Sequence, residues 1–287
     1  MSDPTQDRKE QIMSTGTKEL QKLITHYCEV VGDQVTKLQT LLQSRLISTA
    51  KPEDVARNLH AEVHRMCGAA HCMGFRDFGN QLSKIERKLK KALPRPRRQI
   101  METLDDLEDR FSELTDALDE LQPDNSRVLQ IMAEHAPAKS DTPADEIARQ
   151  KLATRRILIA DDDPFVREVL VSNLTEFGIS NLRTVASGLE VLGAVADFQP
   201  DIIVTDWQME PISGFELLQF IRSGSASVPA ATPIIFFTGE QDRSMMQMAL
   251  TNGADRFLRK PVSPDILLKS LIHIVHNGPV WRGEKSA

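Results

Sequence analysis

The period of the apolar residues changes once along the chain, and no other feature of the sequence limits the fold as strongly. In residues 1–122, apolar residues recur every three or four positions, as on one face of an α-helix. From Arg155 onward, short continuous apolar runs alternate with stretches of helical period. This change predicts two domains of different class, which a length of 287 residues also suggests.

The N-terminal part contains four amphipathic runs, separated by breaks that contain proline or glycine. The runs lie at residues 20–46, 55–73, 78–89 and 100–121. Four such helices joined by short loops predict an antiparallel all-α four-helix bundle over residues 17–122. Residues 1–16, which precede the first run, are expected to form a disordered tail.

Residues 123–154 are expected to form a linker, with one short helix at Ser126–His135. The segment APAKSDTPADE at 136–146 is rich in alanine, proline, aspartate and serine, which is typical of a mobile connection. The second domain would then occupy residues 155–278, followed by a tail at 279–287.

The pattern of the second domain predicts five strands that alternate with helices. The expected strands are Ile157–Ala160, Leu182–Ala186, Asp201–Thr205, Pro233–Phe237 and Arg256–Leu258. Buried strands connected by helices predict a five-stranded parallel sheet of the flavodoxin-like α/β class, with helices on both faces.

The edge of this sheet at which the strands end would collect charged groups. The first strand is followed by Asp161 and two further aspartates, the third by Asp206, the fourth by Thr238 and the fifth by Lys260. Functional sites of such folds lie at this edge. Crowded carboxylates need a counter-charge, which Mg²⁺ can supply while it keeps positions open for phosphate oxygens. Asp206, alone on the central strand, is the natural nucleophile for an acyl phosphate.

Taken singly, these residues have plainer explanations. Asp163 before Pro164 has the pattern of a helix N-cap, Thr238 that of a hydrogen-bonding loop residue, and Lys260 that of a surface residue. Their joint arrangement, with one group per strand, favours a functional site.

Four segments at these strand ends resemble the receiver domain of two-component response regulators. They are ILIADDDP (157–164), DIIVTDWQMEPISGFELL (201–218), PIIFFTGE (233–240) and ADRFLRKP (254–261). The resemblance covers residues 155–278 and implies that Asp206 is the phosphoacceptor. It further implies a Mg²⁺ site formed by Asp161, Asp162, Asp206 and the backbone carbonyl of Gln208.

The same resemblance gives roles to three later residues. Thr238 and Lys260 would contact the phosphoryl group, and Phe257 would be the switch aromatic residue. A rival resemblance is to haloacid-dehalogenase-like phosphatases, because Asp161-x-Asp163 could mimic their Asp-x-Asp motif. That interpretation leaves Asp206 without a role and is not favoured.

A histidine in the second helix of the bundle has an unusual neighbour. In LHAEVHRMCGAAHCMGF (59–75), Gly68 lies four residues after His64 and therefore on the same face. Glycine inside a helix costs about 1 kcal/mol relative to alanine, so it needs a reason. A position without a side chain would let another protein approach the imidazole, whose ring nitrogen can accept a phosphoryl group.

This segment resembles the histidine phosphotransfer (HPt) domain, and the resemblance covers residues 17–121. It implies that His64 is phosphorylated and that Gly68 lies on the surface that a partner approaches. Cys67 occupies a position where many members carry lysine, so transfer would be slower or Arg65 would substitute.

Two other interpretations of this helix stay open. His64 could be merely a polar surface residue of a bundle that has lost the activity. Alternatively, His60, His64, Cys67 and His71 could line one face as metal ligands, although a single helix rarely supplies a complete site.

Two charge runs follow each other in the bundle. Residues 84–98 contain eight basic residues and one acid, and residues 99–121 contain nine acids and one base. We expect the two runs to pair across neighbouring antiparallel helices. The alternative is that the acidic run forms a surface for a partner.

The sequence as a whole predicts a cytoplasmic phosphorelay protein that is not an enzyme, since it has no ATP-binding glycine box. The expected partners are a sensor histidine kinase and other receiver or HPt proteins. A net charge of −6 disfavours nucleic acid, and no apolar run reaches the length of a membrane span. The alternative is an adaptor in which only the receiver switches, while the bundle forms a homodimer or docks a partner.

Overall fold

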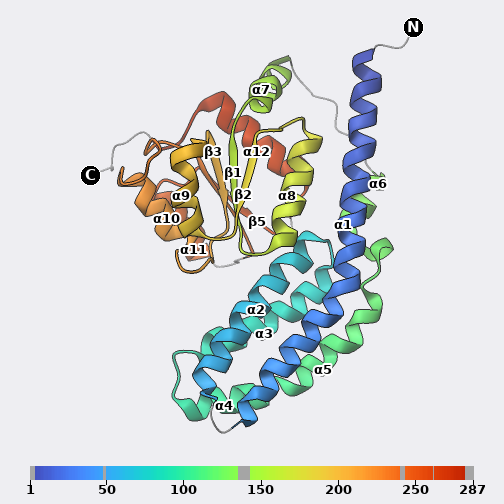
Figure 1. Cartoon of the computed structure of the whole chain (residues 1–287), viewed down its shortest axis with the longest axis vertical. Coiled ribbons are helices and arrows are strands. Elements are labelled where there is room, and N and C mark those ends of the chain that lie inside the picture. The colour runs from blue at the N-terminus through green and yellow to red at the C-terminus, as the bar shows by residue number, and fades with distance from the viewer. Residues whose placement is uncertain (1–3, 48–49, 135–142, 240–242, 261, 282–287) are drawn as a thin grey trace. The chain divides into compact units, whose positions relative to one another are not determined.

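The computed structural model describes residues 4–47, 50–134, 143–239, 243–260 and 262–281. Contacts between residues divide the chain into two compact units: one, Gln21–Glu134, is helical, and the other contains the α/β part of the chain after Glu134. The predicted change of fold class along the chain is therefore confirmed (Figure 1). Within these residues, none of the helices combines the length and the apolarity that crossing a membrane requires.

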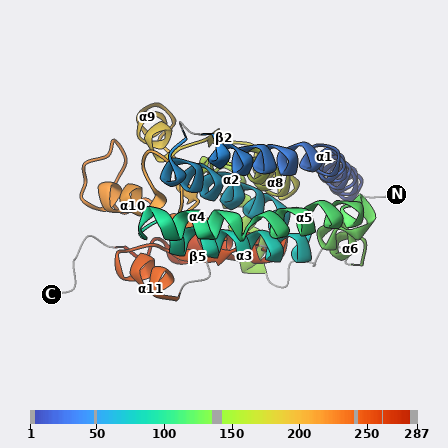
Figure 2. The ribbon, with the colours of Figure 1, turned by 90° about the horizontal axis from the view of Figure 1, so that it is seen from below.

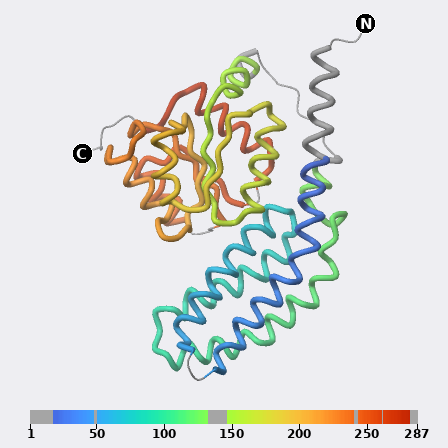
Figure 3. Tube along the Cα trace, viewed as in Figure 1, coloured from blue at the N-terminus to red at the C-terminus, as the bar shows by residue number. Residues whose placement is uncertain are grey.

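The helical unit is a bundle in which the chain reverses direction from α1 to α2, from α2 to α3 and from α3 to α4, and then continues from α4 into α5 without reversing (Figure 3). Its elements are α1 (Pro4–Gln43), η1 (Ser44–Leu46), α2 (Pro52–Cys72), α3 (Arg76–Ala92), α4 (Arg97–Asp105), α5 (Glu108–Asp116) and η2 (Ala117–Glu120). The helices run along one another (Figure 2) and bury the apolar face of each run. In the core, Tyr27 of α1 stacks on Phe75 with 5.8 Å between ring centroids.

The structure differs from the sequence predictions at both ends of this bundle. Residues 4–16, expected to be a disordered tail, continue α1. They contain helix-favouring lysine, glutamine and glutamate, which can extend a helix that is already nucleated without any apolar pattern. The predicted fourth helix is divided into α4 and α5. Leu104 and Leu107 are buried on either side of the division, so the apolar pattern continues across it and could not reveal it.

The expected linker contains more structure than its composition suggests. A 3-10 turn, η3 (Pro123–Asn125), precedes α6 (Arg127–Glu134), which matches the predicted short helix as far as the described residues extend. Ser126 Oγ donates to the carbonyl of Met73 at 2.6 Å, so the start of this segment is tied to the bundle. A further helix, α7 (Pro143–Ala153), was not expected. It packs on α12 through Ala148 and Leu152, and two apolar residues one turn apart are too short a pattern to predict a helix.

The α/β unit contains a five-stranded parallel sheet in the order β2-β1-β3-β4-β5. Its strands are β1 (Ile157–Ala160), β2 (Leu182–Val185), β3 (Ile202–Thr205), β4 (Ile234–Thr238) and β5 (Arg256–Arg259). In register, Ile157 of β1 lies between Leu182 and Ile202 of the neighbouring strands. The five predicted strands are thus all present, and β1, β3 and β4 are buried along their whole length.

Helices cover both faces of the sheet (Figure 1). They are α8 (Pro164–Glu176), α9 (Gly188–Phe198), α10 (Gly214–Arg222), α11 (Arg243–Thr251) and α12 (Pro264–Asn277). A continuous core packs α9, α10 and α11 against one face, through Leu158, Ile203 and Phe236. Alternate residues of the same strands point to the other face, so the ends of the buried strands β1, β3 and β4 are packed from two sides.

The predicted charge pairing is found in only part of the two runs. Lys88 and Asp106 form an ion pair of 3.8 Å between α3 and the turn that follows α4. Asp105 and Glu108 instead bind Arg45, whose side chain is only 3% exposed. The acidic run is thus used partly to hold η1 in place.

Candidate functional site

The carboxyl ends of the strands bring three carboxylates together. Asp161 follows β1, Asp206 follows β3, and one ligand atom from each, with one from Asp162, lies within 4.8 Å of the others. Asp161 and Asp206 are 1% and 2% exposed. Gln208 lies half-buried in the loop after β3. Among the described residues, no other group of His, Cys, Asp and Glu side chains meets this criterion for a metal site.

Lys260 supplies the positive charge at this site. Its Nζ donates to Asp161 Oδ2 at 2.6 Å and lies 3.5 Å from Asp206 Oδ2. The side chain is 2% exposed, so these contacts are shielded from water. Thr238 ends β4 and is fully buried, and its carbonyl accepts a hydrogen bond of 2.8 Å from the backbone N–H of Lys260. The predicted ammonium therefore lies beside two of the predicted carboxylates, and Thr238 is joined to Lys260 through the backbone.

The charges at this site are not balanced. Three carboxylates and one ammonium leave a formal charge of −2. Burial raises the pKa of Asp161 to about 7, because the attraction of Lys260 does not compensate for the loss of water and for the repulsion by Asp206. A divalent cation with oxygen ligands would neutralise the excess negative charge, so the residues present fit Mg²⁺.

Asp163 has the plainer role. Its Oδ1 accepts hydrogen bonds from the backbone N–H groups of Phe165 at 2.8 Å and Val166 at 3.2 Å, which makes it the N-cap of α8. The Asp163 carboxylate, which is the second of the Asp161-x-Asp163 motif, is therefore already occupied at the start of α8. The geometry therefore gives no support to the phosphatase interpretation.

An aromatic cluster lies directly behind Asp206. The backbone N–H of Trp207 donates to Asp206 Oδ1 at 2.6 Å, and its ring lies 5.1 Å from the rings of Phe215 and Phe236. The ring of Phe257, the expected switch residue, is half-buried 6.2 Å from Trp207. Trp207 thus contacts Asp206 through its backbone and Phe257 through its ring, a connection that the sequence analysis did not identify.

Gly214 at the start of α10 is a second residue that the sequence analysis missed. A Cβ atom there would overlap the carbonyl oxygen of Asp206, and the Gly214 N–H donates to the carbonyl of Trp207 at 3.0 Å. Ser213 and Glu216 form a capping box that begins the helix at this point. The capping box was readable in the sequence as SGFE, but the close approach of the backbones was not.

We expect Gly214→Ala to destabilise the α/β unit by about 1–3 kcal/mol, the usual cost of overpacking. It should also displace the Asp206 loop and slow any reaction at Asp206. Thermal unfolding followed by circular dichroism would measure the first effect. Gly193→Ala in α9 is the matched control, because a Cβ there meets no atom within 4 Å. Equal melting temperatures for the two variants would contradict the assigned role of Gly214.

In the helical unit, His64 of α2 is held by a carboxylate of α3. The distance between His64 Nδ1 and Glu86 Oε1 is 2.6 Å, and the side chains are 11% and 15% exposed. Burial alone would raise the pKa of Glu86. The hydrogen bond with His64 and the nearby charges of His64, His60 and Lys90 outweigh burial and lower this pKa. Glu86 is thus ionised and can accept a hydrogen bond. In the sequence it stood out only as the one acid in the basic run at residues 84–98.

The other candidate residues of α2 are packing residues or neighbours of His64. Cys67 is buried, with Sγ 3.0 Å from Ser83 Oγ. His71 is also buried, and its Nδ1 lies 2.9 Å from the carbonyl of Cys67. The His and Cys residues of α2 form no metal group within the described part of the chain. Gly68 lies one turn after His64, as predicted, and is buried in this structure.

Two families match separate parts of the chain. Residues 157–272 match the response regulator receiver domain, and residues 22–124 match the Hpt domain.

Individual relatives match about two fifths of the chain. The chemotaxis protein CheY1 of Helicobacter pylori is 29% identical over 119 residues, which are 40% of this chain and 93% of that protein. The transcriptional regulatory protein GltR of Pseudomonas aeruginosa is 34% identical over 114 residues, which are 40% of this chain and 46% of GltR. The solved structure of the chemotaxis response regulator CheY4 of Vibrio cholerae is 30% identical and has a TM-score of 0.38. It covers 42% of this chain and 98% of CheY4. The chain thus spans about half the length of GltR.

Proposed function

Because the chain combines an Hpt domain with a response regulator receiver domain, a pairing that indicates two-component phosphorelay signalling, we propose that it passes phosphoryl groups through Asp206 and His64. Asp206 accepts the group from a phosphohistidine, and His64 exchanges it with a receiver aspartate of this chain or of another. A sensor histidine kinase is the proposed source of the phosphoryl group. The observation that carries the proposal is the convergence of Asp161, Asp162, Asp206 and Lys260 at one edge of the sheet.

In the proposed reaction at the receiver, a carboxylate oxygen of Asp206 attacks the phosphorus of a phosphohistidine. A P–O bond forms, the P–N bond breaks, and its electron pair returns to the imidazole nitrogen. Lys260 and Thr238 would hold phosphoryl oxygens, and the burial of both side chains next to the carboxyl ends of β4 and β5 supports these roles. Asp161, Asp162 and Asp206 would hold Mg²⁺, with the Gln208 carbonyl as a further proposed ligand. When bound, the ion offsets negative charge on the transferring group.

The contact with Glu86 supports His64 as the acceptor in the bundle. In the proposed state an ionised Glu86 accepts a hydrogen bond from the Nδ1–H of His64, which favours the neutral tautomer in which Nε2 carries the lone pair. That nitrogen is the nucleophile toward the phosphorus of an aspartyl phosphate: a P–N bond forms, the P–O bond to the aspartate breaks, and its electron pair returns to the carboxylate. The carboxylate also stabilises the cationic ring that forms as the new P–N bond is made. Since Glu86 can orient the ring, the absence of lysine at position 67 does not exclude transfer.

The test is to identify the phosphorylated side chains chemically. The full-length protein is incubated with ³²P-labelled phosphoramidate and Mg²⁺, and the label is then exposed to acid, alkali or hydroxylamine. We expect a hydroxylamine-sensitive acyl phosphate and an acid-labile, alkali-stable phosphohistidine. EDTA should suppress the acyl phosphate. Complete absence of label would overturn the proposal, and acyl phosphate alone would favour the adaptor in which the bundle only docks a partner or forms a homodimer.

We expect Glu86→Ala to slow phosphorylation of His64 by about ten- to a hundredfold. This is the effect of losing one hydrogen bond to a charged group, which contributes about 1.5–3 kcal/mol. Glu86→Gln keeps an acceptor oxygen and should lose less. The ¹⁵N chemical shifts of the His64 ring would show the tautomer directly. The matched control is Glu102→Ala, which removes a carboxylate paired with the exposed Arg98. Unchanged ring shifts in Glu86→Ala would contradict the orienting role.

A further inference from the structure

A groove rich in basic side chains lies between α3 and α5, and neither proposed phosphorylation site uses it. Its volume is about 280 Å³, and we call it the basic groove. The lining residues are Lys84, Ile85, Arg87, Lys88, Lys91 and Arg110. Five of these six residues are cations. This is the basic run of the sequence, which the expected pairing with the acidic run only partly explains.

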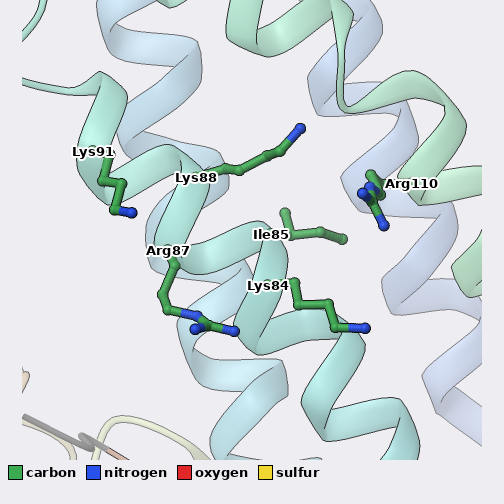
Figure 4. A pocket seen from close by; sticks show the side chains of 6 residues that line it. All are labelled: Lys84, Ile85, Arg87, Lys88, Lys91 and Arg110. Carbon is green, nitrogen blue, oxygen red and sulfur yellow. The ribbon is translucent and has the colours of Figure 1, made fainter.

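The side chains are arranged around a partly apolar surface. Figure 4 shows Lys84, Ile85 and Lys88 extending from α3 toward Arg110, while Arg87 and Lys91 project from the adjoining side of α3. Ile85 is buried, whereas Lys84, Arg87 and Lys91 are exposed. The groove therefore offers charged ends above an apolar floor, to which the lysine stems also contribute.

Most of these charges are not neutralised by the protein. Within the described residues, no carboxylate pairs with Lys84, Arg87 or Lys91; Arg87 donates to the carbonyl of Ser83. Lys88 reaches Asp106 at 3.8 Å, and Arg110 reaches Glu113 at 3.4 Å on its own helix. Both pairs are exposed and contribute little. The groove thus keeps a net positive charge.

This arrangement costs stability in the free protein. Lys84 and Lys88, and likewise Arg87 and Lys91, are four residues apart on one helix. Like charges at this spacing on one helix face repel one another and destabilise the helix. The bundle core does not require them, since the apolar face of α3 packs independently. A bound anion would attract each of these cations and would offset the repulsion between them.

The surroundings favour a compact anion over an extended one. Two acidic residues of the neighbouring run, Asp106 and Glu113, border the cationic side chains. A nucleic acid or an anionic membrane would meet these carboxylates and a chain of net charge −6. The volume of 280 Å³ is close to the lower end of small-molecule sites, about 300 Å³.

We propose that the basic groove binds a compact anion with a di- or triphosphate group, either a nucleotide or an inorganic polyphosphate. The cations of α3 and Arg110 hold the phosphate oxygens. Ile85 and the lysine stems offer apolar contact that the nucleoside part of a nucleotide would use and an inorganic polyphosphate would not. The site does not depend on phosphorylation of His64 or Asp206.

The test is calorimetric titration of the full-length protein in EDTA, so that the acidic site holds no metal. The probes are tripolyphosphate, ATP, adenosine and a short DNA duplex. We expect tripolyphosphate and ATP to bind and adenosine not to bind. Equal affinities would identify the phosphate chain alone as the ligand, and tighter binding of ATP would identify a nucleotide. Absence of binding by both anions, or tighter binding of DNA than of either, would overturn the proposal.

Charge reversal locates the site. Lys84→Glu combined with Lys91→Glu should weaken binding of both anions at least about tenfold, because two attractions become repulsions. The control combines Lys151→Glu with Lys269→Glu, exposed residues of the other unit, and changes the net charge equally. Should the charge reversals disturb folding, glutamine at positions 84 and 91 gives a milder variant. Equal loss in both double variants would show a non-specific charge effect and refute the site, whereas the His64→Gln protein should bind normally.

Discussion

Asp206→Asn is expected to abolish acyl phosphate formation on the receiver, with a loss in rate of at least about a thousandfold. In enzymes, removal of the nucleophile lowers the reaction rate by more than this factor. The amide has nearly the shape of the carboxylate and keeps an oxygen to accept the 2.6 Å hydrogen bond from the Trp207 N–H. It lacks the negative charge and the nucleophilic oxygen that attack phosphorus requires. Hydroxylamine-sensitive label after incubation with ³²P-phosphoramidate and Mg²⁺ measures the effect.

Two further observations separate loss of the nucleophile from loss of the fold. The asparagine removes one of three crowded carboxylates, so the variant should unfold at the same or a higher temperature than the parent protein. Asp197→Asn, on the exposed surface of α9, is the control and should be labelled normally. Hydroxylamine-sensitive label on the Asp206→Asn protein would place the acceptor on another carboxylate, such as Asp161 or Asp162.

The acidic site could be predicted from the sequence because sheet geometry is highly regular. Strands in a parallel sheet end at the same edge. Recognising the ends of β1, β3 and β5 was therefore sufficient to predict that Asp161, Asp206 and Lys260 lie together. Asp161 and Asp206, and likewise Asp206 and Lys260, are more than 40 residues apart in the sequence. This separation does not affect the prediction, because only the position at a strand end matters. The continuous apolar runs identified β1, β3 and β4, because these strands are buried along their whole length and have no solvated face to interrupt the apolar sequence.

The residues that the sequence did not reveal depend on how elements are rotated and how closely they approach. Glu86 meets His64 because α3 turns that face toward α2, and nothing in the spacing of either helix fixes this rotation. Gly214 is needed because two backbones nearly touch, which is a property of the loop after β3. Arg45 can be buried because Asp105 and Glu108, which are 60 or more residues away in the sequence, accept hydrogen bonds from its guanidinium group. Each contact follows from packing between elements, while periodicity describes one element at a time.

His64→Gln is expected to remove all acid-labile, alkali-stable label and to leave the acyl phosphate on Asp206. Glutamine can still reach Glu86 with its amide N–H, so the contact between α2 and α3 should persist. It has no ring nitrogen with a lone pair to attack phosphorus. His26→Gln, at an exposed histidine of α1 whose side chain is 60% exposed, is the control and should keep the label. Alkali-stable label that survives in His64→Gln would assign the phosphohistidine to another position.

Mixing the two variants tests the exchange itself. The His64→Gln protein is first labelled on Asp206, freed of phosphoramidate and then added to unlabelled Asp206→Asn protein, which retains His64. Transfer between chains would move alkali-stable label onto the Asp206→Asn protein, and adding Glu86→Ala to that acceptor should slow the movement about ten- to a hundredfold. Transfer confined to one chain would leave the mixture unchanged, while wild-type protein labelled first on Asp206 would still develop phosphohistidine. If neither the mixture nor the wild-type protein moves label from aspartate to histidine, His64 does not exchange phosphoryl groups with the receiver of this protein.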